Sequence, residues 1–158
     1  MSIDRLSALH HTRNMTGSDA ALAAAFGMAI TVPQAAALGF EPGIIADGKA
    51  MMSLPWRADL VEDEGSQALA SGIITTMLDH CGGMAVTAVK VGQFHPATLD
   101  LRIDFLRPAA ARAGVTVQVH CYRVAGPIAY VRGEAWDLDP VDPIATVQGA
   151  FVHNGVPA

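Results

Sequence analysis

Asp79 is the residue of this 158-residue chain that is best placed to do chemistry. It lies beside Leu78 and Cys81 in a run whose apolar residues recur at helical spacing, so we expect it on a buried helix. A carboxylate in such surroundings can attack an electrophile or deprotonate water. It can equally well form a structural ion pair with Arg102 or Arg107, and the residues alone leave both readings open.

The start of the same predicted helix offers hydrogen-bond donors. Ala70, Ser71 and Gly72 are small, and backbone N–H groups at a helix start can polarise a carbonyl or stabilise an oxyanion. Gly72 precedes Asp79 by seven residues, about two helical turns, so both project from nearly the same side. Almost every helix has such an end, so this feature alone does not identify an active site.

The histidines and cysteines do not indicate a metal site. His80 adjoins Asp79, but neighbours on a helix point about 100° apart and cannot easily share one ion. We expect a packed or surface histidine there and no bound metal. Cys81 and Cys121 are too few for a disulfide framework, and we expect both to be inert thiols in a reducing compartment.

Hydrophobic periodicity predicts the elements that position these residues. Proline opens and glycine ends a short helix at 33–38, and alternation predicts a strand at 48–56. An acidic loop at 59–68 leads to the long apolar helix, and Gly82 and Gly83 within it indicate a close backbone approach. Four strands follow, at 99–106, 115–122, 128–137 and 144–153.

These elements define an expected fold. In the first strand after the helix, alternation places Leu99, Leu101, Ile103 and Phe105 on one face. We expect an α+β domain in which an antiparallel sheet of about five strands wraps around one long central helix.

Two runs resemble hotdog-fold acyl-CoA thioesterases of the phenylacetic-acid-degradation (PaaI) type. They are LASGIITTMLDHCGGMA at Leu69–Ala85 and ATLDLRIDFLRPA at Ala97–Ala109. The likeness extends in register from about Pro33 to Val152. It implies a hotdog domain over 31–158, preceded by an N-terminal extension over 1–30 that we expect to be partly helical.

The resemblance implies roles for specific residues. The aspartate that ends the family's helix motif, taken as nucleophile or general base, falls on Asp79. The second motif glycine, whose amide polarises the thioester carbonyl, falls on Gly72, and the first falls on Ser71. A serine or threonine that supports the site from the next strand falls on Thr98.

Two polar groups of the family pattern are altered in this chain. The motif histidine is Ala70, and an asparagine that helps hold substrate or water falls near Glu64. A Ser71 hydroxyl or a Gln67 amide can stand in for the imidazole, although both residue types are also common helix caps.

The resemblance also has implications for coenzyme A binding and for the assembly of subunits. Arg107, at the end of the strand after the helix, either meets the phosphates of coenzyme A or is simply solvated. The resemblance further implies a site completed across a two-fold dimer, with Asp79 of one subunit facing Gly72 of the other.

We therefore expect a thioesterase that hydrolyses an acyl- or aryl-CoA thioester to a carboxylate and free coenzyme A, without a cofactor. A non-catalytic acyl-CoA-binding protein is the alternative, because Ala70 replaces the motif histidine. A hotdog dehydratase needs a catalytic histidine paired with an acid, and no motif of that kind is present.

Composition narrows the choice of partners. Ten Lys and Arg against 15 Asp and Glu give a net charge of −5, which argues against nucleic acid. The apolar run at 20–30 is too short to cross a membrane, and we expect a cytoplasmic protein without a signal peptide. Hydrophobic residues make up 51% and charged residues 16%, so we expect a homodimer or a dimer of dimers.

Overall fold

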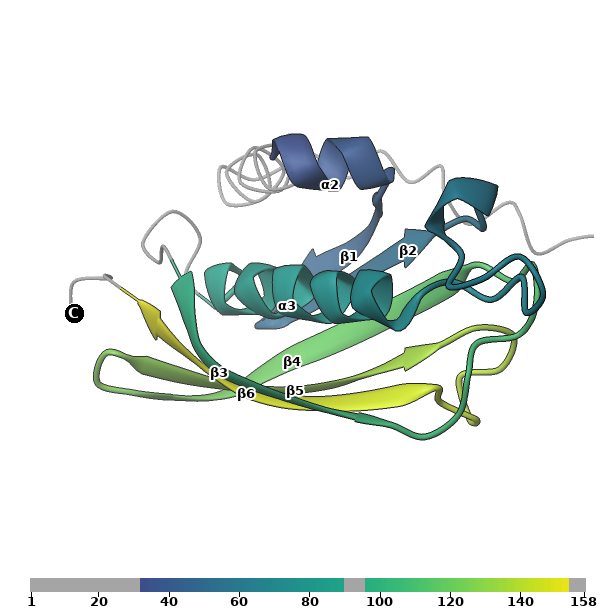
Figure 1. Ribbon diagram of the computed structural model, residues 1–158. Coiled ribbons are helices and arrows are strands. Elements are labelled where there is room, and N and C mark those ends of the chain that lie inside the picture. Colours follow the sequence, from purple (N-terminus) through teal and green to yellow (C-terminus); the bar gives the residue numbers. More distant parts are fainter. Residues whose placement is uncertain (1–31, 90–95, 154–158) are drawn as a thin grey trace, which may run out of the picture.

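The computed structural model of the protein describes residues 32–89 and 96–153, where one antiparallel sheet of six strands curls around helix α3 (Figure 1). The helical segments are α2 (Pro33–Leu38), the short 3₁₀ helix η1 (Ala58–Leu60) and α3 (Ser71–Thr87). The strands are β1 (Glu41–Ala46), β2 (Lys49–Leu54), β3 (Pro96–Phe105), β4 (Val115–Ala125), β5 (Ile128–Trp136) and β6 (Ala145–His153).

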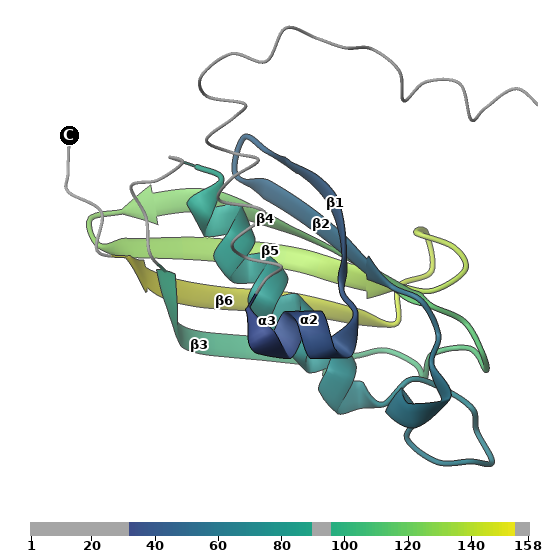
Figure 2. The same cartoon turned by 90° about the horizontal axis from the view of Figure 1, so that it is seen from above.

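The sheet has the order β1-β2-β4-β5-β6-β3, so β1 and β3 form its two edges (Figure 2). Its inner face packs on α3, and α2 lies on the other side of that helix (Figure 1). This arrangement confirms the predicted α+β class and the single wrapped helix. The helix expected within residues 1–30 lies outside the described residues.

Strand β1 was not predicted from the sequence, and the sheet has six strands where about five were expected. Pro42 and Gly43 interrupt the alternation that marks a strand, and the pairing of β1 with β2 is irregular between Pro42 and Ile45. Asp47 and Gly48 connect the two strands, both with positive φ, as a tight hairpin turn requires. That Asp-Gly pair was the available signal for β1.

Helix α3 is buried as its composition predicted. Met77, Leu78 and Cys81 are fully enclosed in the core. Gly82 in its middle does allow a close approach, but by a side chain and not by backbone. A Cβ added to Gly82 would lie 2.8 Å from Cζ of Phe151 on β6.

Strand β3 contains a bulge that reverses the expected orientation of its first residues. Its register against β6 shifts between Thr98 and Asp100. Thr98 pairs with buried Phe151 and therefore faces α3, whereas Leu99 is 57% exposed. The prediction that Leu99 lies on the inner face was wrong, because the extra residue of a bulge changes the parity of the strand.

Candidate active site

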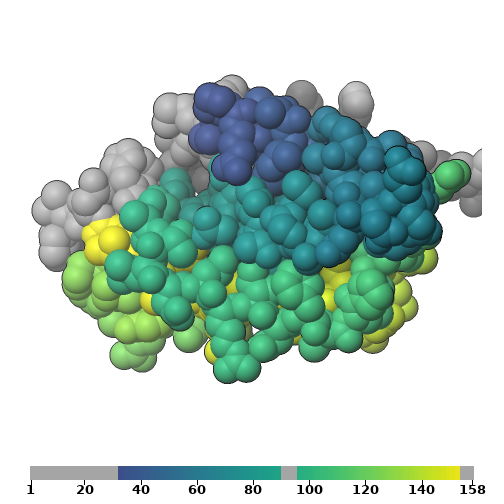
Figure 3. Space-filling model, in the orientation of Figure 1, coloured from purple at the N-terminus to yellow at the C-terminus, as the bar shows by residue number. Residues whose placement is uncertain are grey.

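Asp79 lies on α3 where that helix passes the start of β3. Its Oδ1 accepts a hydrogen bond of 2.7 Å from the Thr98 hydroxyl. Asp79 is half-buried and Thr98 is exposed, so the carboxylate is held in place yet reachable from outside the chain. In the space-filling view, the side chains of α3 and β3 meet on the visible face (Figure 3).

The N-terminus of α3 presents an available backbone donor. Ile73 and Ile74 N–H both donate to the Ala70 carbonyl, and Ser71 N–H lies 3.4 Å from Oε2 of Glu62. No acceptor for the Gly72 N–H is found among residues 32–89 and 96–153. A Cβ added to Gly72 would meet nothing within 4 Å, so open space surrounds this position.

Glu62 is a neighbour of this helix start that was not predicted as a site residue. Its carboxylate accepts a hydrogen bond where the helix dipole is positive, which stabilises the negative charge. The position before the helix, in an acidic loop, was the available signal. Ala70 occupies the N-cap without a side-chain cap, so no imidazole or hydroxyl hangs over the first turn from that residue.

A pocket of about 230 Å³ opens beside this helix start. Ser71 and Ile74 line it from α3, and Phe105 and Arg107 line it from the end of β3. Two of the residues predicted for the site, Ser71 and Arg107, therefore share this pocket. Asp79 is not among the residues that line it.

Glu64 and Gln67 belong to the loop that forms one wall of the pocket region. The Gln67 amide donates to the Glu64 carbonyl at 2.7 Å, and Gln67 adopts a positive φ of 52°. Its own carbonyl accepts bonds from the Trp56 indole and from Arg112 N–H. Gln67 thus shapes its loop, while the Glu64 carboxylate is exposed.

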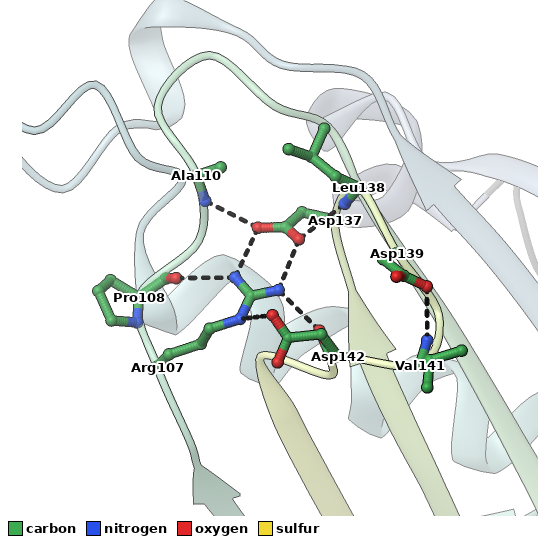
Figure 4. Close-up of polar contacts among 8 residues, drawn as sticks. All are labelled: Arg107, Pro108, Ala110, Asp137, Leu138, Asp139, Val141 and Asp142. Carbon is green, nitrogen blue, oxygen red and sulfur yellow. Dashed lines mark hydrogen bonds and ion pairs between the residues drawn. The ribbon is translucent and has the colours of Figure 1, made fainter.

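Arg107 is held by partners from its own chain (Figure 4). Its Nη1 and Nη2 atoms donate to the two carboxylate oxygens of Asp137, at 2.9 and 2.8 Å. They also donate to the Pro108 and Asp142 carbonyls, and Nε lies 2.9 Å from the Asp142 carboxylate. All three guanidinium nitrogens are engaged, so a contact with coenzyme A phosphates would compete with these bonds.

The ion pair between Arg107 and Asp137 shifts the pKa of both side chains. The hydrogen bonds from Arg107, aided by the N–H groups of Ala110 and Leu138, hold the pKa of Asp137 well below its ordinary value despite burial. The Asp137 side chain is 1% exposed. Asp137 in turn raises the pKa of Arg107 above its already high value, so this pair stays charged at physiological pH.

Among residues 32–89 and 96–153, neither a metal site nor a reactive thiol lies near Asp79. No group of three or more His, Cys, Asp or Glu residues in the described ranges is arranged to hold a metal ion. Burial raises the pKa of the Cys81 thiol to about 12, which keeps it protonated. The His80 ring packs 6.0 Å from the ring of Phe40.

Of the helices within the described residues, none has the length and apolar character that a membrane crossing requires.

Comparisons with known proteins agree with this architecture. A family model described as the thioesterase superfamily matches residues 68–144, which contain α3 and the three strands that follow it. A protein of known structure from Pseudomonas aeruginosa is 31% identical, with 84% of this chain and 98% of that chain covered and a TM-score of 0.73. No match is found among the curated proteins.

Two further solved structures share the fold at lower identity. The PaaI protein from the phenylacetic acid degradation operon of E. coli is 20% identical, with 85% of this chain and 94% of that chain covered and a TM-score of 0.73. A Streptococcus mutans protein bound to acetyl-CoA is 13% identical, with 75% and 91% covered and a TM-score of 0.65.

The helix-wrapping sheet and these structural matches define a hotdog-fold protein. The chain belongs to the thioesterase superfamily. The resemblance to PaaI-type proteins that the two sequence runs carried is thereby confirmed at the level of the fold.

Proposed function

We propose that the protein is an acyl-CoA thioesterase that cleaves a thioester to a carboxylate and free coenzyme A. The observation that carries the proposal is the reachable Asp79 carboxylate, oriented by Thr98, on a helix whose first turn leaves the Gly72 N–H available. The superfamily match over 68–144 supports it, because that range contains all three residues.

Helix geometry supports the site across two subunits that the resemblance implies. Seven residues at about 1.5 Å per residue separate Gly72 and Asp79 by about 10 Å along α3. A reacting carbonyl must lie about 3 Å from both its donor and the attacking group. We therefore propose that Asp79 of one subunit works with Gly72 of the other, in a homodimer or a dimer of dimers.

The proposed reaction balances without a cofactor. Gly72 N–H polarises the thioester carbonyl and stabilises the tetrahedral oxyanion. Asp79 removes a proton from the attacking water, the C–S bond breaks, and the proton passes to the departing coenzyme A thiolate. In the alternative route, Asp79 attacks the carbonyl carbon itself and water then hydrolyses the mixed anhydride.

The test is thiol release from a panel of acyl- and aryl-CoA thioesters. We expect turnover by the wild type and a loss of at least 100-fold in Asp79→Asn, the order of effect of general acid–base catalysis. Asp100→Asn, an exposed aspartate on the outward side of β3, is the matched control and should retain activity. Full activity in Asp79→Asn would refute this mechanism, and hydroxylamine trapping would reveal the anhydride route.

A second candidate function is acyl-CoA binding without hydrolysis. The specific observation that favours it is Ala70 at the N-cap of α3, where the family pattern has histidine and no side chain caps the helix. A binder would be stabilised against heat by acyl-CoA while releasing no thiol. Hydrolysis that depends on Asp79 would exclude this candidate.

A further inference from the structure

The pocket beside the start of α3 has one wall that the sheet itself does not hold in place. This wall is lined by Phe105, Arg107, Pro108 and Ala109. Strand β3 ends at Phe105, so Pro108 and Ala109 lie in the loop that follows it. Proline has no N–H to donate, and the position of this loop therefore depends on bonds from elsewhere in the chain.

The ion pair between Arg107 and Asp137 supplies those bonds (Figure 4). Nη1 of Arg107 donates to the Pro108 carbonyl at 3.2 Å. Oδ2 of Asp137 accepts a hydrogen bond of 2.8 Å from Ala110 N–H. Ala109 lies between these two fixed peptide groups and is buried. The ion pair thus fixes the loop on both sides of a residue that lines the pocket.

Asp137 is committed entirely to this arrangement. Its side chain is 1% exposed, and its oxygens accept two bonds from Arg107 and one each from Ala110 and Leu138 N–H. Four bonds fill the accepting capacity of a carboxylate. Asp137 follows β5 and Arg107 follows β3, and β6 lies between these two strands in the sheet. The ion pair therefore connects strand ends that are not neighbours.

The guanidinium of Arg107 serves groups of its own chain, although the residue lines the pocket. Besides Asp137 and Pro108, it engages Asp142, whose carbonyl accepts from Nη2 and whose carboxylate lies 2.9 Å from Nε. A phosphate that bound this guanidinium would have to displace these partners. The buried Asp137 charge would then lose its counterion, which is strongly unfavourable.

We propose that Arg107 and Asp137 are positioning residues that fix the pocket wall of Pro108 and Ala109 for substrate binding, and that Arg107 does not bind the phosphates of coenzyme A. This inference rests on the proposed function, because it takes the pocket beside α3 as part of the acyl-CoA site. A wall that touches no reacting atom contributes equally to binding of the substrate and of the transition state. Its displacement should raise KM and leave kcat unchanged.

The test compares two thioesters that carry the same acyl group. One is the acyl-CoA, and the other is the acyl thioester of N-acetylcysteamine, which lacks the nucleotide and all phosphates. Arg107→Lys keeps a positive charge that can meet a phosphate, but an ammonium cannot reproduce the planar fork that holds Asp137. We expect KM to rise by about tenfold for both thioesters, with kcat unchanged.

Two further variants probe the same wall from its other partners. Asp137→Asn keeps the shape of the side chain and should also raise both KM values. If Arg107 instead bound phosphate, its release from Asp137 would lower KM for the acyl-CoA alone. Asp142→Asn is milder, because that carboxylate is 69% exposed, and it should raise both KM values by a smaller factor.

A matched control separates positioning from general loss of stability. Arg57 is another arginine with an ion pair and two carbonyl partners, formed with Asp59, Ala37 and Leu38. It does not line the pocket, so Arg57→Lys should leave both KM values unchanged. Circular dichroism should show that all variants are folded. Partial unfolding would lower kcat per chain without raising KM, which is the opposite of the expected result.

Two kinetic outcomes would overturn the proposal. A loss confined to the acyl-CoA, or a lower KM for it in Asp137→Asn, would show that Arg107 contacts the phosphates. Wild-type KM values in all three variants would show that this wall does not position the substrate.

Failure of the proposed function gives a different result. If the wild type releases no thiol from either thioester, the hydrolase proposal fails, and dissociation constants of the same two compounds from calorimetry replace KM. Binding that weakens equally for both compounds in Arg107→Lys would still support the positioning role. Absence of binding by either compound to the wild type would overturn it.

Discussion

Replacing Thr98 with valine removes the hydroxyl that orients Asp79 while keeping the shape of the side chain. The lost bond is short, 2.7 Å between Oγ1 and the carboxylate Oδ1, and its acceptor is a carboxylate. Hydrogen bonds to charged groups contribute about 1.5–3 kcal/mol, and the exposure of Thr98 favours the lower end. About 1.5 kcal/mol corresponds to a tenfold loss in kcat/KM.

The assay is the initial rate of thiol release from the best acyl-CoA substrate, with kcat and KM separated. We expect kcat to fall and KM to change little, because Thr98 acts through Asp79. Thr98→Ser keeps the hydroxyl and should retain most of the activity. The melting temperature should not fall in the valine variant, since valine is favoured in strands.

Two results would refute this reasoning. Wild-type kcat in Thr98→Val would show that the bond to Asp79 does not orient the carboxylate during turnover. An equal loss in the valine and serine variants would show that the position matters for packing, and that the hydroxyl is not the cause.

Three other predictions concern stability and reactivity. Gly82→Ala should lower the free energy of unfolding by about 1 kcal/mol, because strain against Phe151 outweighs the gain in helix propensity. Gly83→Ala should raise it by a similar amount, because a Cβ at Gly83 has only ordinary contacts. Urea denaturation that ranks the two variants the other way would contradict this prediction. Asp137→Asn should lower the free energy of unfolding by about 2 kcal/mol at pH 7. Because the folded-state pKa of Asp137 is depressed, this difference in stability from the wild type should shrink as the pH falls below about 4. A difference that does not depend on pH in melting experiments would argue against the ion pair. Cys81, fully buried and with a pKa of about 12, should react with a thiol reagent only after unfolding, and mass spectrometry showing label on native protein would disprove this.

The elements could be predicted from sequence wherever side-chain burial is periodic. Helix α3 and strands β4 to β6 bury one side regularly, and the alternation or helical spacing of their apolar residues follows directly. Strand β1 lies at an exposed edge, so no burial imposes a pattern on it. Its only local signal is the Asp47-Gly48 turn.

The candidate site was predictable in its residues but not in its geometry. The placement of Asp79 and Gly72 on one helix follows from spacing alone. The contact between Thr98 and Asp79 does not, because strict alternation points Thr98 to the outer face of the sheet. The bulge at Leu99 reverses that orientation, and the sequence carries no glycine or proline there to mark it.

The same bulge explains how one edge strand serves two faces. In a regular strand, Thr98 would share its side with Arg102 and Asp104, and all three would point away from α3. The extra residue turns Thr98 inward to Asp79 and leaves the other two outward, where they bridge each other. A single insertion therefore supplies the inner site with its hydroxyl without disturbing the outer pattern of charges.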